Sequence, residues 1–393
     1  MTRTDVVIIG AGASGLMCAI EAGKRGRRVV LLDHAPTVGA KILTSGGGRC
    51  NFTNRAIEHS SYISQNPHFC KSVLSRYTQW DFLALVEKHG IPCCERDHGR
   101  FFCRDSARDI VSMLLAECAA AGVEIRLNVR VDTVEPVTGG GFDVSTSKER
   151  LTCESLVVAT GGLSMPGAGA SPLGYRIAQQ LGINVIPTRP GLVPLTLQKE
   201  DREVLSRLAG ISVPCIVSTG TQSFSDDLLI THRGLSGPAI LQISSYWQPG
   251  EEIIVNLLPN VDLVEELSSR RAHRSKSKVK TVLEGFLPGR LLGALLGPEE
   301  LDRPVLDTSD RELRQIADRL HRWVVRPGGT EGNRTAEVTC GGVDCNAVSS
   351  RTMVATQVPG LHFVGEVLDV TGWLGGYNFQ WAWSSGWCAG QHA

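Results

Sequence analysis

The chain has no excess of charge of one sign. Its 393 residues include 40 Lys and Arg side chains and 40 Asp and Glu side chains, so its formal net charge is zero. Nucleic acids and anionic membranes usually attract proteins through a broad positive field, which this balance removes. We therefore expect a small-molecule substrate and no membrane partner. A nucleic-acid partner is not expected either, because any basic site must be local.

Long apolar runs are also missing. No stretch approaches the 18 apolar residues of a membrane-spanning helix. Residues 1–4 lead directly into Val6–Ile9 without the apolar segment of a signal peptide. We expect a cytoplasmic protein.

The twelve cysteines include no C-x-x-C pair. Their scatter through ordinary globular sequence is typical of reduced thiols rather than of a disulfide framework. Cys93–Cys94 and the pair Cys340 and Cys345 do not supply four ligands at a known metal spacing. We expect no metal site.

Glycine is abundant, with 43 residues that cluster in particular loops. The first cluster, Gly10–Gly15, follows the apolar run Asp5–Ile9 and precedes a helical segment. A second apolar run, Val29–Leu32, ends at Asp33, 23 residues after Gly10. Strand, glycine turn, helix, strand and terminal acid in this register form a dinucleotide fingerprint, which by itself does not separate FAD from NAD. The expected dinucleotide contacts are Gly10, Gly12, Ala13, Ser14, Gly15, Asp33 and His34.

The far end of the chain returns to the same kind of structure. Leu156–Gly162 predicts another buried strand with a glycine turn, Leu361–Glu366 predicts a further short strand, and residues 379–386 predict a closing helix. The N-terminus of that helix carries about half a positive charge, which would stabilise the N1–C2=O edge of a reduced flavin. Asp369 either accepts from a ribityl hydroxyl or is a solvated surface acid. The candidate contacts in these segments are Ala159, Thr160, Gly161, Gly365, Glu366, Asp369, Gly375, Gly376, Tyr377 and Asn378.

Three segments carry a resemblance to a known family. The first is Thr44–Asn54, which contains the motif S-G-G-G-R-C-N; the second is Thr231–Pro238; and the third begins with Gly365–Asp369 and continues through Gly376–Asn378. They resemble a large bacterial family of NAD(P)/FAD-dependent oxidoreductases that includes aminoacetone oxidases and a flavin reductase of bile-acid dehydroxylation. The resemblance spans nearly the whole chain. It departs locally at Cys103, where the family tends to have proline.

The resemblance implies an α/β fold in which an FAD-binding Rossmann-type domain, similar to that of glutathione reductase, is interrupted by a β-barrel-like insertion carrying a small helical subdomain. We expect residues 1–189 and 338–393 to form the FAD domain. Residues 190–261 and 327–337 would form the insertion, and residues 262–326 the helical subdomain. The pattern also predicts helices over residues 55–90, a helix start at Ser106, and one alternating strand from Val123 to Val131. The resemblance places Val131 against the adenine.

The glycine run after Thr44 predicts a loop that lies against a flat ring, because side chains would prevent so close an approach. Arg49 and Asn51 would hydrogen-bond the flavin or its pyrophosphate, and Lys41 would neutralise phosphate charge. The expected contacts of this loop are Lys41, Ser45, Gly46, Gly47, Gly48, Arg49 and Asn51. Cys50 is either a flavin-coupled thiol or a packed small side chain, and we favour packing.

Two residues are candidate proton donors. His232 lies beside a glycine-rich loop, and histidine is the side chain best suited to proton transfer near neutral pH, so it is either a general acid or a histidine that fixes its own loop. Tyr377 is a second candidate, although the resemblance assigns its loop chiefly to the flavin.

We expect hydride transfer between flavin N5 and a small organic substrate. The chain has one dinucleotide fingerprint, so NAD(P)H would bind only transiently as electron donor. The alternatives are a flavin-dependent hydroxylase, a non-catalytic FAD- or NAD-binding module, and a flavin-dependent nucleic-acid-modifying protein that uses the basic run Arg270–Lys278. The sequence indicates neither the substrate nor the oligomeric state.

Overall fold

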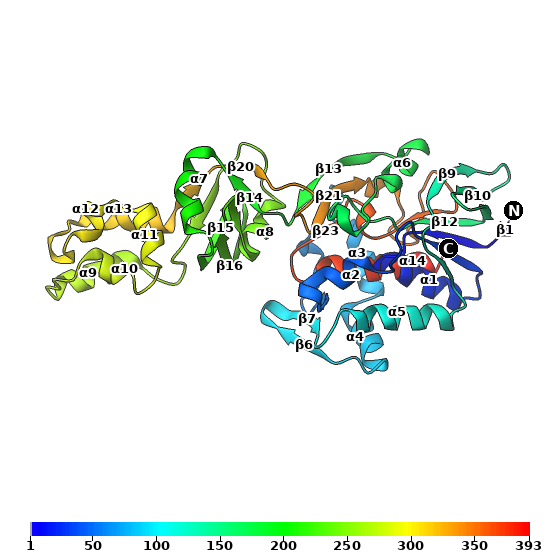
Figure 1. Cartoon of the computed structure of the whole chain (residues 1–393), viewed down its shortest axis with the longest axis horizontal. Helices are drawn as coiled ribbons and strands as arrows, with labels where there is room; N and C mark the ends of the chain where they lie inside the picture. The colour runs from blue at the N-terminus through cyan, green and yellow to red at the C-terminus, as the bar shows by residue number, and fades with distance from the viewer. Residues whose placement is uncertain (1) are drawn as a thin grey trace. The chain divides into compact units, whose positions relative to one another are not determined.

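The computed structural model describes residues 2–393, which form two compact units (Figure 1). The chain up to Pro190 and Glu337–Ala393 form the first unit, and Gly191–Ala336 form the second. Within residues 2–393 no helix combines the length and the apolar character needed to cross a membrane.

A five-stranded parallel sheet lies at the centre of the first unit, in the order β22-β12-β2-β3-β8. Its strands are β2 (Val6–Ile9), β3 (Val29–Leu32), β8 (Glu124–Arg126), β12 (Ser155–Val158) and β22 (Leu361–Phe363). Four of them are runs of buried residues, as expected for parallel strands covered on both faces. Because β22 comes from the far end of the chain, both ends build one sheet, and the predicted Rossmann-type α/β fold is confirmed.

Helices cover this sheet, and the two that matter most come from opposite ends of the chain. They are α1 (Ala13–Lys24) and α14 (Tyr377–Gly390), with α2 (Ala40–Thr44), α3 (Phe69–Arg76), α4 (Gln79–Lys88), α5 (Arg108–Ala120) and α6 (Leu173–Gln180) around them. A Cβ atom at Gly386 of α14 would lie 2.4 Å from the Ser14 carbonyl oxygen of α1. The Arg25 guanidinium, just after α1, donates to the carbonyl oxygens of Gly390 and Ala393 at 3.0 and 3.1 Å.

Smaller sheets complete the first unit. One has the order β1-β11-β10-β9 and another the order β4-β7-β6, and two pairs, β5 with β23 and β13 with β21, are two-stranded. Their bounds are Thr2–Arg3 (β1), Asn51–Asn54 (β4), Tyr62–Ile63 (β5), Cys93–Arg96 (β6), Arg100–Cys103 (β7), Val131–Pro136 (β9), Phe142–Thr146 (β10), Arg150–Cys153 (β11), Val185–Gly191 (β13), Val338–Val343 (β21) and Thr371–Gly372 (β23).

Three local predictions were wrong. The expected single strand from Val123 to Val131 is two strands, β8 and β9, in different sheets, because Asn128 adopts a φ of +55° and turns the chain. Residues 55–90 are not helical throughout, since β5 precedes α3. Helix α5 begins at Arg108 rather than at Ser106, whose hydroxyl accepts from the Arg108 N–H at 3.2 Å.

The second unit contains a seven-stranded sheet and a group of helices. The strand order is β19-β18-β15-β16-β17-β14-β20, and its two outer strands, β19 and β20, follow one another in the chain. The strands are Leu195–Leu197 (β14), Ser212–Thr219 (β15), Gln222–Ile230 (β16), Gly234–Ser236 (β17), Ile253–Asn256 (β18), Trp323–Val325 (β19) and Pro327–Thr330 (β20). The helices are Lys199–Leu205 (α7), Pro238–Ser244 (α8), Leu263–Ala272 (α9), Val279–Leu283 (α10), Gly289–Leu295 (α11), Pro298–Asp302 (α12) and Asp310–His321 (α13). Ser309 and Glu312 form a capping box at the start of α13.

An aromatic cluster fixes α14 within the first unit. The fully buried Trp383 ring stacks on Phe82 of α4 at 4.4 Å and on Phe379 at 5.6 Å. Its indole N–H donates to the Phe52 carbonyl oxygen at 2.8 Å. Trp383 therefore connects α14 to α4 and β4 through both packing and a buried hydrogen bond.

Replacing this ring tests how strongly the C-terminal helix supports the fold. We expect Trp383→Ala to lower the free energy of unfolding by about 3–5 kcal/mol, because it opens a cavity and leaves the Phe52 carbonyl without a donor. Trp80→Ala is the matched control, since that side chain is 53% exposed, and its effect should stay within about 0.5 kcal/mol. Denaturant unfolding measures both. Equal effects of the two substitutions would contradict the packing described.

Candidate functional site

The turn between β2 and α1 gives its three glycines different constraints. Gly10 has a φ of +113°, and a Cβ atom there would lie 2.4 Å from the Ala159 carbonyl oxygen. A Cβ atom at Gly15 would lie 1.9 Å from the Gly10 carbonyl oxygen, whereas at Gly12 no atom lies within 4 Å. Gly10 and Gly15 are thus required by the fold itself. Gly12 faces open space in front of the α1 N-terminus, where a dinucleotide pyrophosphate binds in such turns.

Asp33 is held in place at the end of β3. Its carboxylate accepts from the backbone N–H groups of Ala11 at 2.7 Å and Ala35 at 2.8 Å. The side chain remains 15% exposed, and the His34 ring nitrogen lies 3.5 Å from it. A carboxylate has about four lone-pair sites, so two bonds to the backbone leave capacity for a ribose hydroxyl.

The C-terminal segment reaches the start of α1 through Gly365. This residue has a φ of +74°, and a Cβ atom there would lie 2.5 Å from the Ser14 hydroxyl. Its N–H donates to the Ser385 hydroxyl and its carbonyl accepts from the Trp381 indole, both at 3.0 Å. The residues predicted at the two ends of the chain are therefore brought together here.

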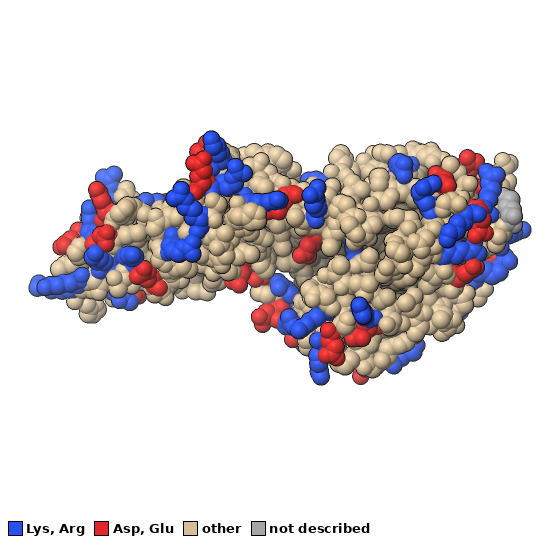
Figure 2. Space-filling view, viewed as in Figure 1, with Lys and Arg blue, Asp and Glu red and all other residues tan. Residues whose placement is uncertain are grey.

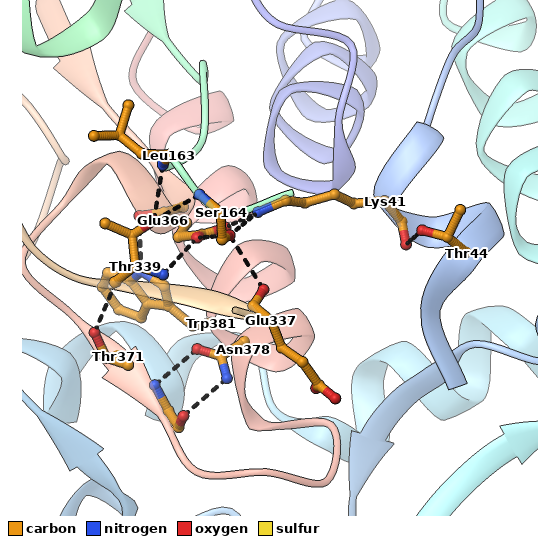
Figure 3. A network of polar contacts seen from close by, with 12 residues as sticks. Lys41, Thr44, Leu163, Ser164, Glu337, Thr339, Glu366, Thr371, Asn378 and Trp381 are labelled. Atoms are coloured by element: carbon orange, nitrogen blue, oxygen red, sulfur yellow. Dashed lines mark hydrogen bonds and ion pairs between the residues drawn. The ribbon is translucent and has the colours of Figure 1, made fainter. Parts of the chain in front are cut away.

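A polar network surrounds Glu366 (Figure 3). The Lys41 ammonium donates to Glu366 and to the Ser164 hydroxyl, both at 2.7 Å, and that hydroxyl donates to Glu366 at 2.9 Å. The Thr339 N–H also donates to Glu366, at 2.9 Å. Lys41 was expected to neutralise phosphate, but its ammonium group forms an ion pair with Glu366 in this structure.

The glycine loop, Ser45–Gly48, has the conformation that its composition demands. Gly46, Gly47 and Gly48 have φ values of +57°, +65° and +83°, which side-chain-bearing residues rarely adopt. No atom lies within 4 Å of a Cβ built at Gly47 or Gly48. One face of the loop backbone is therefore open to a flat ligand.

The N-terminus of α14 lies against β4. A Cβ atom at Gly376 would lie 2.4 Å from the Thr53 backbone. With its amide oriented to satisfy its neighbours, Asn51 accepts from the Gly376 N–H at 3.2 Å and donates to the Phe101 carbonyl at 3.1 Å. Asn378 accepts from the Gly372 N–H at 2.8 Å and thereby fixes the loop before the helix. The N-cap residue Gly376 has no side chain with which to cap α14, so N–H groups of the first turn of the helix are available to a ligand.

Three of the other predicted cofactor contacts, Asp369, Ala159 and Val131, are buried. The Asp369 carboxylate is 5% exposed and accepts from the Gln65 N–H at 2.8 Å, and burial raises its pKa. Ala159 is buried beside Gly10, and Gly161 has a φ of +70°. The Thr160 hydroxyl is buried against Gly174. Val131 is buried at the start of β9.

The two candidate proton donors, Tyr377 and His232, and the Cys50 thiol differ in their exposure to solvent. Tyr377 is 8% exposed, its ring lies between Tyr62 and Trp373, and burial raises its pKa. His232 is exposed in the second unit, between β16 and β17. Cys50 is fully buried, and burial raises the pKa of its thiol far above its usual range.

Sequence reasoning missed Ser164, Thr339, Arg100 and Glu337. The Ser164 hydroxyl contacts the Glu337 carbonyl oxygen at 3.2 Å and bonds Lys41 and Glu366. The protein atoms packed around the Glu337 carboxyl raise its pKa, and the positive charge of Arg100 partly offsets this rise. The sequence signal that could have indicated Glu337 is a charged residue directly before the mostly apolar strand β21. Among residues 2–393 no group of three or more His, Cys, Asp or Glu side chains could hold a metal ion.

These features fit FAD. The space at Gly12 suits a pyrophosphate, the fixed carboxylate of Asp33 suits a ribose, and the open Gly47–Gly48 backbone suits a flat ring. The uncapped N-terminus of α14 offers N–H groups to an anionic flavin edge.

Comparison with known proteins agrees with this geometry. Residues 4–392 match the family model described as HI0933-like protein Rossmann domain. An Escherichia coli (strain K12) protein named ribosomal RNA dihydrouridine synthase is 54% identical over all of this chain and 98% of its own length. A Clostridium scindens protein named 3-dehydro-bile acid delta(4,6)-reductase is 29% identical over 98% of each chain. A quinol-fumarate reductase structure shares the fold, with a TM-score of 0.52, 14% identity and coverage of 99% of this chain and 70% of that one.

Substitution at two glycines separates cofactor binding from folding. Gly12 has an ordinary extended backbone, so Gly12→Ala should fold normally but place a methyl group where the pyrophosphate approaches. We expect its FAD affinity to fall by about 1–3 kcal/mol, which is roughly fivefold to 150-fold in Kd. Gly15→Ala should instead lower the stability of the fold by about 3 kcal/mol. Flavin absorbance and thermal unfolding measure the two effects, and full FAD retention by Gly12→Ala would refute the pyrophosphate placement.

Proposed function

The chain belongs to the HI0933-like family of Rossmann-domain proteins, and we propose that it uses FAD to reduce uridine to dihydrouridine in ribosomal RNA. That it is a flavoprotein of the oxidoreductase type follows from the family and from the fit of the site to FAD. The similarity to the Escherichia coli synthase carries the proposal, because it extends over both units rather than over the cofactor domain alone.

The names of the two relatives describe related chemistry. Dihydrouridine forms when the C5=C6 double bond of uracil, which is conjugated with the C4 carbonyl, is reduced. The name of the Clostridium scindens protein likewise describes the reduction of double bonds at positions 4 and 6 of a bile acid whose C3 is oxidised, so that these bonds are conjugated with a carbonyl group. Conjugate reduction of such a double bond adds a hydride to the carbon distant from the carbonyl and a proton to the carbon nearer to it. Reduced FAD supplies the hydride when it is bound.

The residues of the first unit would hold the cofactor for this task. Gly12 and the α1 N-terminus would bind the pyrophosphate, and Asp33 would bind a ribose hydroxyl. The Gly46–Gly48 loop and the N-terminus of α14 would hold the ring and stabilise negative charge at its pyrimidine edge. The single fingerprint leaves NAD(P)H as a transient electron donor.

An RNA substrate changes the expectation about partners. Charge balance over the whole chain predicted no nucleic-acid partner, but the rRNA-acting relative removes the basis for that exclusion. The basic run Arg270–Lys278 gives limited support, because ion pairs join Arg270 to Glu266, Arg271 to Asp310 and Lys278 to Asp302. Charges matched within the protein contribute little to the binding of phosphates.

The proposal is tested on ribosomal RNA from a strain that lacks this protein. Purified protein with FAD and NADPH or NADH should convert a uridine to dihydrouridine, detected by mass spectrometry of nucleosides as a gain of two hydrogen atoms. Gly12→Ala without bound FAD should give no product. A flavin that NAD(P)H reduces but that no RNA reoxidises would exclude this function, and a flavin that no donor reduces would favour a non-catalytic module.

A further inference from the structure

Glu337 lies next to the Glu366 network but does not join it through its side chain. Its carbonyl oxygen lies 3.2 Å from the Ser164 hydroxyl oxygen, and the same hydroxyl contacts Lys41 and Glu366. The next strand, β21, begins at Val338. Figure 3 shows the Glu337 carboxylate pointing away from these contacts. Among the described residues, that carboxylate has no hydrogen-bond or ion-pair partner.

The charged neighbour of Glu337 belongs to the flavin end of the site. Arg100 begins β7, and its side-chain atoms lie 3.2 Å from where a Cβ atom of Gly375 would stand, directly before α14. Its guanidinium acts electrostatically on both Glu337 and Tyr377. Glu337 is thus linked to the Lys41–Glu366 network through its backbone, and Arg100, which acts on its carboxyl group, borders the loop that leads into α14.

Part of Glu337 reaches solvent, while the protein atoms packed around its carboxyl group raise its pKa above that of an ordinary glutamate. A general acid is most effective when its pKa lies close to the operating pH.

Other acids of the first unit are less suited to reach a substrate. Glu366 forms an ion pair with Lys41, and Asp369 is buried against the Gln65 N–H. The Cys50 thiol is fully buried, and the Tyr377 ring is packed between two aromatic rings.

We propose that Glu337 is the catalytic acid that protonates the carbon next to the carbonyl, C5 of the uracil ring. This inference rests on the proposed function. A hydride from FAD that NAD(P)H has reduced forms the C6–H bond as the C5=C6 π bond breaks. The electron pair released onto C5 and the C4 oxygen takes the Glu337 proton and forms the C5–H bond. Glu337 is left as a carboxylate and regains its proton from water, while FAD is left oxidised.

The acid acts in its protonated form, so the rate of flavin reoxidation by RNA should fall as pH rises through the Glu337 pKa. Desolvation by the surrounding protein raises the pKa of Glu337, and the positive charge of Arg100 lowers this pKa by a smaller amount. Arg100→Gln removes the lowering contribution and should move the falling limb of the pH profile to higher pH. Arg100→Lys keeps the charge and should move it less.

The experiment uses the FAD-bound protein, reduced with dithionite and mixed with unmodified ribosomal RNA in a stopped-flow instrument. We expect Glu337→Gln to bind FAD normally, to be reduced normally, and to be reoxidised by RNA about 10²–10⁴-fold more slowly, without the pH limb. Compared with Glu337→Gln, Glu337→Asp should restore part of the reoxidation rate and the fall of that rate as pH rises. Glu87→Gln, an exposed glutamate on α4, is the matched control and should behave as wild type.

A second readout needs no turnover. Infrared difference spectra of the oxidised protein should show a carboxyl band that titrates above the usual range of glutamate and is absent from Glu337→Gln. Three results would overturn the proposal: loss of FAD by this variant, unchanged reoxidation, or a rate loss confined to His232→Asn. Failure of the wild-type protein to make dihydrouridine would instead reject the proposed function, and the role of Glu337 with it.

Discussion

The close contact between the two ends of the chain is the constraint on which the site depends. Helix α14 can approach α1 only because Gly386 and Gly390 have no side chains, since Cβ atoms there would meet the Ser14 carbonyl at 2.4 Å and the Glu21 side chain at 2.6 Å. The Arg25 guanidinium then donates to a carbonyl oxygen of Gly390, the last residue of the helix, and to the Ala393 oxygen beyond it. Together with β22, this contact makes the C-terminal segment part of the N-terminal fold, so neither end can build the site alone.

This packing has an electrostatic consequence. The α1 N-terminus faces open space at Gly12, and α14 begins without a side-chain cap. Each helix N-terminus carries about half a positive charge, and unmatched helix ends are normally satisfied by side chains, water or ligands. A dinucleotide with an anionic pyrophosphate at one position and a ring that becomes anionic at another matches both ends. The cofactor therefore satisfies groups that the fold itself leaves open.

The sequence predicted the parts of this arrangement whose signals are local. The strand–turn–helix at Gly10–Gly15 and the run Val29–Leu32 required only neighbouring residues, and the glycine loop was visible as a run of three. The alternation from Val123 to Val131 misled because nothing local marks the turn at Asn128. Glu337 was missed for a different reason, since its meaning depends on Ser164, 173 positions away, and on Arg100. The ion pair between Lys41 and Glu366 likewise joins residues 325 positions apart.

The same constraint would allow one cofactor site to serve different substrates. Conjugate reduction needs a hydride, a proton and a means of holding charge on a carbonyl, and the first two do not depend on whether the double bond belongs to a nucleobase or a steroid. In this chain the groups suited to the hydride step lie on strand ends, helix ends and glycine turns that the fold fixes. Substitutions elsewhere can then change what is reduced without changing how. The proposed RNA substrate rests on the full-length similarity at 54% identity, whereas FAD binding rests on the family match and on the residues of the site.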